Sequence, residues 1–140
     1  MQSAKTVNAG ISGVSRLPWV PSFWQGRVRS IWCAMRGIVT MLARERNAWV
    51  HLVATAVVAL GGIHCQLSTA EWCWIVLAIT VVWIAEALNT ALEYLTDLVC
   101  PVYHPLARKA KDVAAGGVLI AAAGAALIGL LIFAPHISPR

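Results

Sequence analysis

Three long apolar stretches constrain this chain more than any other feature. They cover residues 48–63, 72–85 and 113–134, and the first is interrupted only by His51 and Thr55. About 20 residues of helix cross the hydrocarbon core of a bilayer. The composition agrees, because 59% of the residues are hydrophobic and only 12% are charged. The sequence therefore predicts an all-α membrane protein with transmembrane spans at about residues 48–64, 70–99 and 112–134.

Two segments precede the first span. Residues 1–22 mix Ser, Gly, Pro and a few charges without periodicity, and no apolar core with a cleavage site follows, so we expect a disordered tail and not a signal peptide. Residues 23–140 then form one membrane domain. Within it, residues 24–46 place apolar side chains at three- and four-residue steps with arginines between them. This pattern predicts an amphipathic helix that lies on the membrane surface.

Local signals mark the ends of the helices. Ser68 and Glu71 form a Ser-x-x-Glu capping box, so the second span should begin at about Thr69, with Glu71 as a capping residue. Pro101 and Pro105 should interrupt the helix between the second and third spans. Lys and Arg precede the first span and join the second to the third, whereas the intervening loop has none. The amino terminus should therefore be cytoplasmic and the carboxyl terminus outside.

Small residues recur at four-residue steps along the third span, which favours close helix packing. They are Gly117, Ala121, Ala125 and Gly129.

A polar stripe runs along the second half of the second span. Glu86, Asn89, Glu93 and Asp97 are three, four and four residues apart, so they share one face of a helix. Glu86 should lie below the membrane surface, and Glu93 and Asp97 at and beyond it. An ionisable side chain inside a membrane is costly and usually has a function.

Two further acidic residues, Glu45 and Asp112, are expected at the same depth in the membrane as Glu93. Glu45 precedes the first span, and Lys111 with Asp112 precedes the third, so these side chains and Glu93 should share the cytoplasmic membrane surface. Carboxylates beside a lysine suit Mg²⁺ that carries a nucleotide, because Mg²⁺ takes oxygen ligands from one or two carboxylates and from phosphates. The net charge of +5 suits a nucleotide or anionic lipid headgroups and does not choose between them.

Glu86 and Glu93 should have separate roles, since seven residues of helix place them about 10 Å apart along the axis. The deeper Glu86 suits a general base acting on the headgroup hydroxyl of a lipid. The alternative is a buried carboxylate satisfied by a neighbouring helix. The sequence has no P-loop and no zinc-site spacing of its cysteines, and nothing in it suggests a nucleic-acid partner.

Several motifs between about residues 34 and 135 carry a family resemblance. They are Ala34-x-x-Gly37, Glu45-Arg-Asn47, His51, Leu67-Ser-x-x-Glu-Trp72, Glu86-x-x-Asn-Thr-Ala-x-Glu93, Asp97 and His104-Pro-Leu-Ala-x-x-Ala-Lys-Asp-x-Ala-Ala115. With them the chain resembles the small prokaryotic integral-membrane diacylglycerol kinases and the related undecaprenol kinases. The Glu-x-x-Asn-Thr-Ala-x-Glu string with a downstream Ala-Lys-Asp is highly specific.

The resemblance implies an ATP-dependent kinase of a membrane lipid alcohol in the bacterial inner membrane. It also implies a homotrimer whose helices share each active site, with the membrane lipids, ATP and the lipid substrate as partners. The implied roles are a catalytic base for Glu86 with Asn89 as its helper, Mg²⁺ ligands for Glu45 and Glu93, and nucleotide contacts for Asp97, Lys111 and Asp112. Where the family often has aromatic residues facing the nucleotide, this chain has Ile31, Trp32 and Cys33.

Two questions stay open at this point. The lipid alcohol is either undecaprenol or diacylglycerol. The alternative function is a non-catalytic membrane subunit that carries an ion or a proton at Glu86, or a bare scaffold, but neither explains the further acids and the lysine at the membrane surface.

Overall fold

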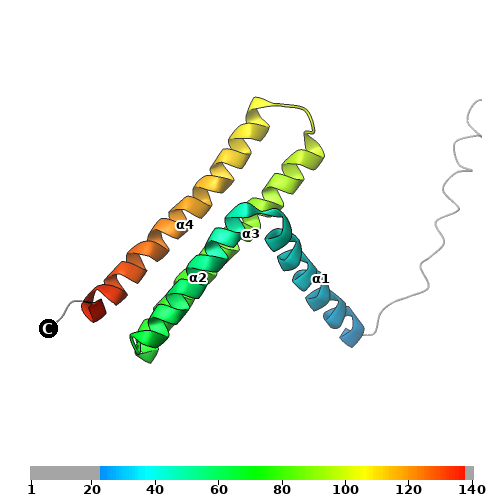
Figure 1. Cartoon of the computed structure of the whole chain (residues 1–140). Helices are drawn as coiled ribbons and strands as arrows, with labels where there is room; N and C mark the ends of the chain where they lie inside the picture. Colours follow the sequence, from blue (N-terminus) through cyan, green and yellow to red (C-terminus); the bar gives the residue numbers. More distant parts are fainter. Residues whose placement is uncertain (1–22, 138–140) are drawn as a thin grey trace, which may run out of the picture. The chain divides into compact units, whose positions relative to one another are not determined.

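The structure is a computed structural model, and it describes residues 23–137 (Figure 1). The tail predicted for residues 1–22 lies outside the described residues. Four α-helices follow one another in the described part, and they are α1 (Phe23–Arg44), α2 (Arg46–His64), α3 (Thr69–Val99) and α4 (Pro105–Ile137). The chain divides into two units within α1. The first unit ends at Met35, and the second, Arg36–Arg140, contains all the predicted site residues.

The last three helices have the length and composition of membrane spans. They contain 19, 31 and 33 residues, and each is long and apolar enough to cross a membrane. The predicted all-α class, with three helices long and apolar enough to span a membrane, is therefore confirmed for the described residues.

The helix ends follow from residues of special geometry. α1 stops at Arg44, two residues before the predicted end, because Glu45 has an extended backbone with φ of −98° and ψ of 118°. α4 begins earlier than the predicted third span, at Pro105, since proline fits the first turn of a helix, where its missing N–H is not needed. At the other end, α4 runs through Pro135 to Ile137.

The predicted capping box at the start of α3 is confirmed. The backbone N–H of Ser68 donates to Oε2 of Glu71 at 2.7 Å, and the backbone N–H of Glu71 reaches the Ser68 hydroxyl at 3.4 Å. The Ser68 hydroxyl also donates to the Glu71 carboxylate at 2.6 Å. Glu71 therefore stabilises a helix end, as predicted.

Helix α3 lies between α2 and α4, contacts both, and runs antiparallel to α4 (Figure 1). One face of α3 is buried along its length at helical spacing. Its members are Ile75, Ala78, Val82, Glu86, Asn89 and Thr90. The buried face is thus apolar in the first half of the helix and polar in the second half.

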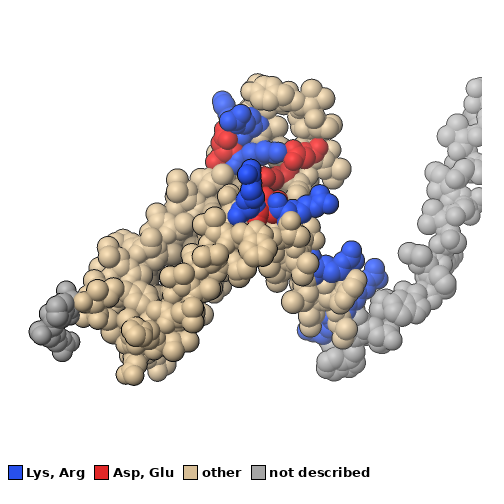
Figure 2. All heavy atoms as spheres, in the orientation of Figure 1, with Lys and Arg blue, Asp and Glu red and all other residues tan. Residues whose placement is uncertain are grey.

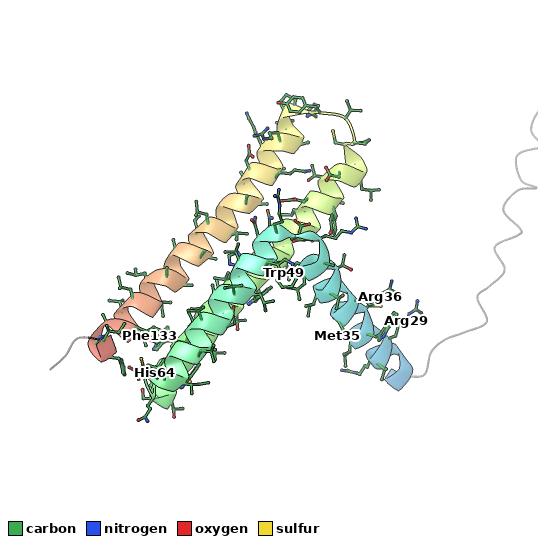
Figure 3. All side chains as sticks on the ribbon, in the orientation of Figure 1. Arg29, Met35, Arg36, Trp49, His64 and Phe133 are labelled. Carbon is green, nitrogen blue, oxygen red and sulfur yellow. The ribbon has the colours of Figure 1, made fainter. Side chains whose placement is uncertain are left out.

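Most charged side chains of α3 and α4 lie toward the loop that joins the two helices. On the face shown in Figure 2, acidic and basic side chains gather near that loop, whereas the pair of Glu71 and His136 lies at the other end of α3 and α4. At that other end lie His64 of α2 and Phe133 of α4 (Figure 3). The polar half of the buried face of α3 therefore lies in the charged half of the bundle.

Candidate active site among helices α2, α3 and α4

Glu86 is the largest fully buried side chain in the described residues. Only 1% of its surface is exposed, and Asn89 and Thr90, one turn further along α3, are also buried. Burying polar groups is costly unless they form hydrogen bonds. Yet Oε2 of Glu86, Oδ1 of Asn89 and Oγ1 of Thr90 have no hydrogen-bond partner among the described residues. Three unsatisfied oxygen atoms on one turn of helix indicate a site that is built for a ligand or for another molecule.

His51 of α2 faces Glu86. Its Nε2 lies 3.8 Å from Oε2 of Glu86, and 15% of the His51 side chain is exposed. In the sequence, His51 stands out as a polar residue inside the first predicted span, but its position alone does not indicate a function.

Asn89 and Glu93 interact along α3. The Nδ2 amide of Asn89 donates to Oε1 of Glu93 at 3.0 Å, the geometry of an i, i+4 pair on one helical face. This bond orients the Glu93 carboxylate and leaves Oδ1 of Asn89 free to accept a hydrogen bond.

Glu45 joins the group from the break between α1 and α2. Its side chain makes no capping hydrogen bond to α2. The charges of Glu45 and Glu93 both act on the carboxyl group of Glu86. The carboxylate predicted as the base and the two predicted as Mg²⁺ ligands therefore lie near enough to interact electrostatically.

Glu45 and Glu93 could supply a metal with one or two carboxylates but not with a complete set of ligands. Within residues 23–137, no three His, Cys, Asp or Glu side chains converge closely enough to hold a metal by themselves. Mg²⁺ usually keeps several waters and takes one or two carboxylates together with phosphate oxygens. Glu93, held by Asn89, and the uncapped Glu45 suit this mode of binding.

The predicted nucleotide residues form two ion pairs near the α3–α4 loop. Lys111 Nζ of α4 lies 2.5 Å from Oδ1 of Asp97 on α3, and the charge of Glu93 also acts on Lys111. Asp112 instead pairs with Arg108 of its own helix, at 3.3 Å. Asp97, Lys111 and Arg108 line an open pocket of about 180 Å³. The sequence analysis assigned no role to Arg108. The only sequence feature that pointed to it was its place in the basic segment between the second and third spans.

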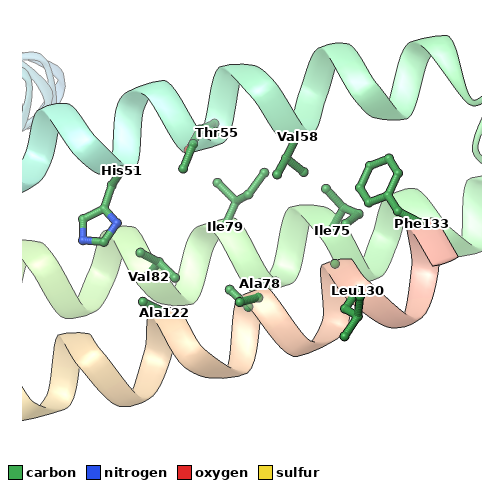
Figure 4. Close-up of a pocket in the computed structure, with 14 residues that line it drawn as sticks. His51, Thr55, Val58, Ile75, Ala78, Ile79, Val82, Ala122, Leu130 and Phe133 are labelled. Atoms are coloured by element: carbon green, nitrogen blue, oxygen red, sulfur yellow. The ribbon is translucent and has the colours of Figure 1, made fainter. Parts of the chain in front are cut away.

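A larger apolar cavity of about 490 Å³ lies among α2, α3 and α4. His51 and Phe133 lie toward opposite ends of the set of lining residues, and aliphatic side chains such as Ile75, Ile79 and Val82 lie between them (Figure 4). A second cavity of about 250 Å³ is lined by Asn47, His51 and Asn89 together with apolar residues. His51 is thus shared by an apolar cavity and a more polar one.

Fold and site together define a helical membrane protein with three spans and a cluster of buried and half-buried acids. Residues 32–133 match the family model of prokaryotic diacylglycerol kinase. The chain is 43% identical over 104 residues to an undecaprenol kinase of Bacillus subtilis, which covers 74% of this chain and 85% of that relative. It is also 37% identical over 103 residues to a diacylglycerol kinase of Synechocystis, covering 73% of this chain and 59% of that relative.

The chain belongs to the prokaryotic diacylglycerol kinase family. The predicted membership is confirmed, and the matched residues include every predicted site residue.

Proposed function

We propose that this protein is an ATP-dependent kinase that phosphorylates the hydroxyl group of a membrane lipid alcohol, with Glu86 as its general base. The observation that carries the proposal is the Glu86 carboxylate, which is 1% exposed on a helix of membrane-spanning length and has an unsatisfied oxygen. A lipid hydroxyl is a substrate that can reach a base at such a position, because its hydrocarbon chain stays in the bilayer. Family membership supports the same reaction class.

The chemistry needs one proton transfer and one phosphoryl transfer. Glu86 accepts the proton of the lipid hydroxyl as its oxygen forms a bond to the γ-phosphorus of ATP. The bond between that phosphorus and the β,γ-bridging oxygen breaks, and ADP leaves with the electron pair. Asn89 assists, since its free Oδ1 can accept a hydrogen bond while its Nδ2 holds Glu93.

Glu45 and Glu93 would hold Mg²⁺, which neutralises charge on the nucleotide phosphates when it is bound. Asp97, Lys111 and Asp112 provide the nucleotide side. Lys111 supplies a cation next to a small open pocket, and Asp97 restricts its orientation by the ion pair.

The protein's place in the membrane belongs to the same proposal. α1 would lie on the cytoplasmic surface of the bacterial inner membrane, with the amino terminus inside and the carboxyl terminus outside. The subunits would form a homotrimer. A Cβ added at Gly117 would meet nothing within 4 Å in the single subunit, so the close packing predicted for this position would have to come from another copy.

The test is phosphorylation of undecaprenol and of diacylglycerol, side by side, in mixed micelles with Mg-ATP. Undecaprenol is the first substrate to test, because a relative with 43% identity over 85% of its length is named an undecaprenol kinase. We expect ATP consumption that depends on the added lipid alcohol. A protein that consumes no ATP with either lipid would contradict the proposal.

A further inference from the structure

We propose that His51 is a positioning residue that orients the Glu86 carboxylate for its reaction with the lipid hydroxyl. The proposal rests on the function proposed above, in which Glu86 is the base. It assigns a role to a histidine in the first predicted span.

The contact between the two residues is the first argument. Nε2 of His51 faces Oε2 of Glu86 at 3.8 Å, and this is the oxygen atom that has no hydrogen-bond partner within residues 23–137. A shift of about 1 Å would bring the pair to hydrogen-bond distance. Both side chains are largely shielded from water, so a bond between them would not compete with solvent.

The His51 ring is itself held in place. The indole ring of Trp83 meets it edge to face, with ring centroids 6.5 Å apart and an interplanar angle of 68°. Nε1–H of Trp83 donates to Oγ1 of Thr55 at 3.1 Å. Thr55 is one turn beyond His51 on α2, and Trp83 is one turn before Glu86 on α3. Two contacts between the same faces of α2 and α3 therefore fix the ring opposite the carboxylate.

The charges around Glu86 show why such a partner is needed. Glu45 and Glu93 both place negative charge near Glu86. The amide group of the neighbouring Asn89 donates to Glu93, so it is not available to Glu86. Among the described residues, His51 is the basic side chain whose nitrogen lies within 4 Å of the Glu86 carboxylate. It can donate from Nε2–H when neutral and carries the opposite charge when protonated.

His51 lines both cavities, so the orientation that it gives the Glu86 carboxylate matters for a substrate bound there. The ring lines the apolar cavity on one side and the smaller cavity with Asn47 and Asn89 on the other. A bond from this ring would hold the Glu86 carboxylate in one orientation beside both cavities. Misplacement of a reacting group by about 1 Å can cost on the order of 100-fold in rate.

The experiment compares three variants in the full-length protein. His51→Leu removes the donor and keeps an apolar side chain of similar size, whereas His51→Gln keeps an N–H donor near the position of Nε2. His64→Leu makes the same chemical change on the same helix, at an exposed residue at its far end. The measurements are kcat and KM for Mg-ATP with the lipid alcohol, together with the oligomeric size in detergent.

We expect His51→Leu to lower kcat about 10- to 100-fold with KM for Mg-ATP and oligomeric size unchanged. His51→Gln should restore most of kcat, and His64→Leu should behave like the parent protein. Parent-like kcat in His51→Leu overturns the proposal, as does a His51→Gln variant no better than His51→Leu. Loss of the oligomer or of Mg-ATP affinity in His51→Leu would show a structural role and overturns it too. If the parent protein phosphorylates no lipid alcohol, the proposed function itself fails. If the parent is active and His51→Leu has the same kcat, only the role proposed for His51 fails.

Discussion

Replacing Glu86 by glutamine tests the base assignment most directly. The change keeps the shape of the side chain and removes its charge and its ability to accept a proton. A general base contributes on the order of 100- to 10,000-fold in rate, so turnover should fall by that factor. This fall corresponds to about 3–5 kcal/mol of activation free energy.

The structure also predicts that Glu86→Gln keeps the stability and the Mg-ATP affinity of the parent protein. A neutral amide costs less to bury than a carboxylate, and Glu86 is buried with an unsatisfied oxygen. The variant should therefore be at least as stable as the parent protein. The nucleotide residues Asp97 and Lys111 pair with each other and not with Glu86, so the affinity for Mg-ATP should stay near that of the parent.

The assay needs turnover with the lipid alcohol, equilibrium binding of a Mg-nucleotide, and a thermal midpoint in detergent. Glu71→Gln is the matched control, because it makes the same change on the same helix at the capping box, where glutamine also caps. It should keep parent-like turnover.

Two results would refute the reasoning about Glu86. One is parent-like turnover of Glu86→Gln, and the other is loss of nucleotide binding together with activity. In either case the base must be another carboxylate, with Asp112 next in line, although its pairing with Arg108 at the surface gives it a less suitable setting.

Three further predictions concern the metal, the packing of the helices and the assembly. Glu45→Gln or Glu93→Gln should raise the Mg²⁺ concentration needed for half-maximal activity, and two variants that titrate with Mg²⁺ like the parent would contradict the ligand assignment. Gly62→Ala should be about 1–3 kcal/mol less stable than the control Gly61→Ala in thermal unfolding. A Cβ at Gly62 would lie 2.8 Å from the Trp72 ring, whereas a Cβ at Gly61 would lie 3.4 Å from its nearest neighbour. Equal midpoints would argue against this tight packing. A Cβ added at Gly117 would meet nothing within 4 Å in the subunit. Gly117→Leu should therefore lower the oligomeric size in detergent through contacts with other copies, and an unchanged size would exclude this stripe as an interface.

Much of the fold follows from the sequence because its signals are local. The three spans come from apolar stretches of membrane length, and the start of α3 at Thr69 comes from the Ser68–Glu71 capping box. The polar stripe was also predictable, since residues at three- and four-residue steps share a helical face whatever surrounds them. The start of α4 was less well predicted, because the third span was placed by its apolar residues, whereas the helix begins at Pro105 in a polar segment.

The candidate site was predictable only as a set of residues at one depth. Depth follows from distance along each helix, but contacts between helices depend on how each helix is rotated and how closely it packs, and neither is encoded in the period of one segment. Tertiary structure therefore decided that His51 faces Glu86, and that Lys111 pairs with Asp97 across two helices. The pair between Asp112 and Arg108 is different, because the two residues are one turn apart on α4 and their spacing alone brings them together. The sequence by itself determined which side chains lie at each level along the helices, and only the packing of α2, α3 and α4 determined which of them meet.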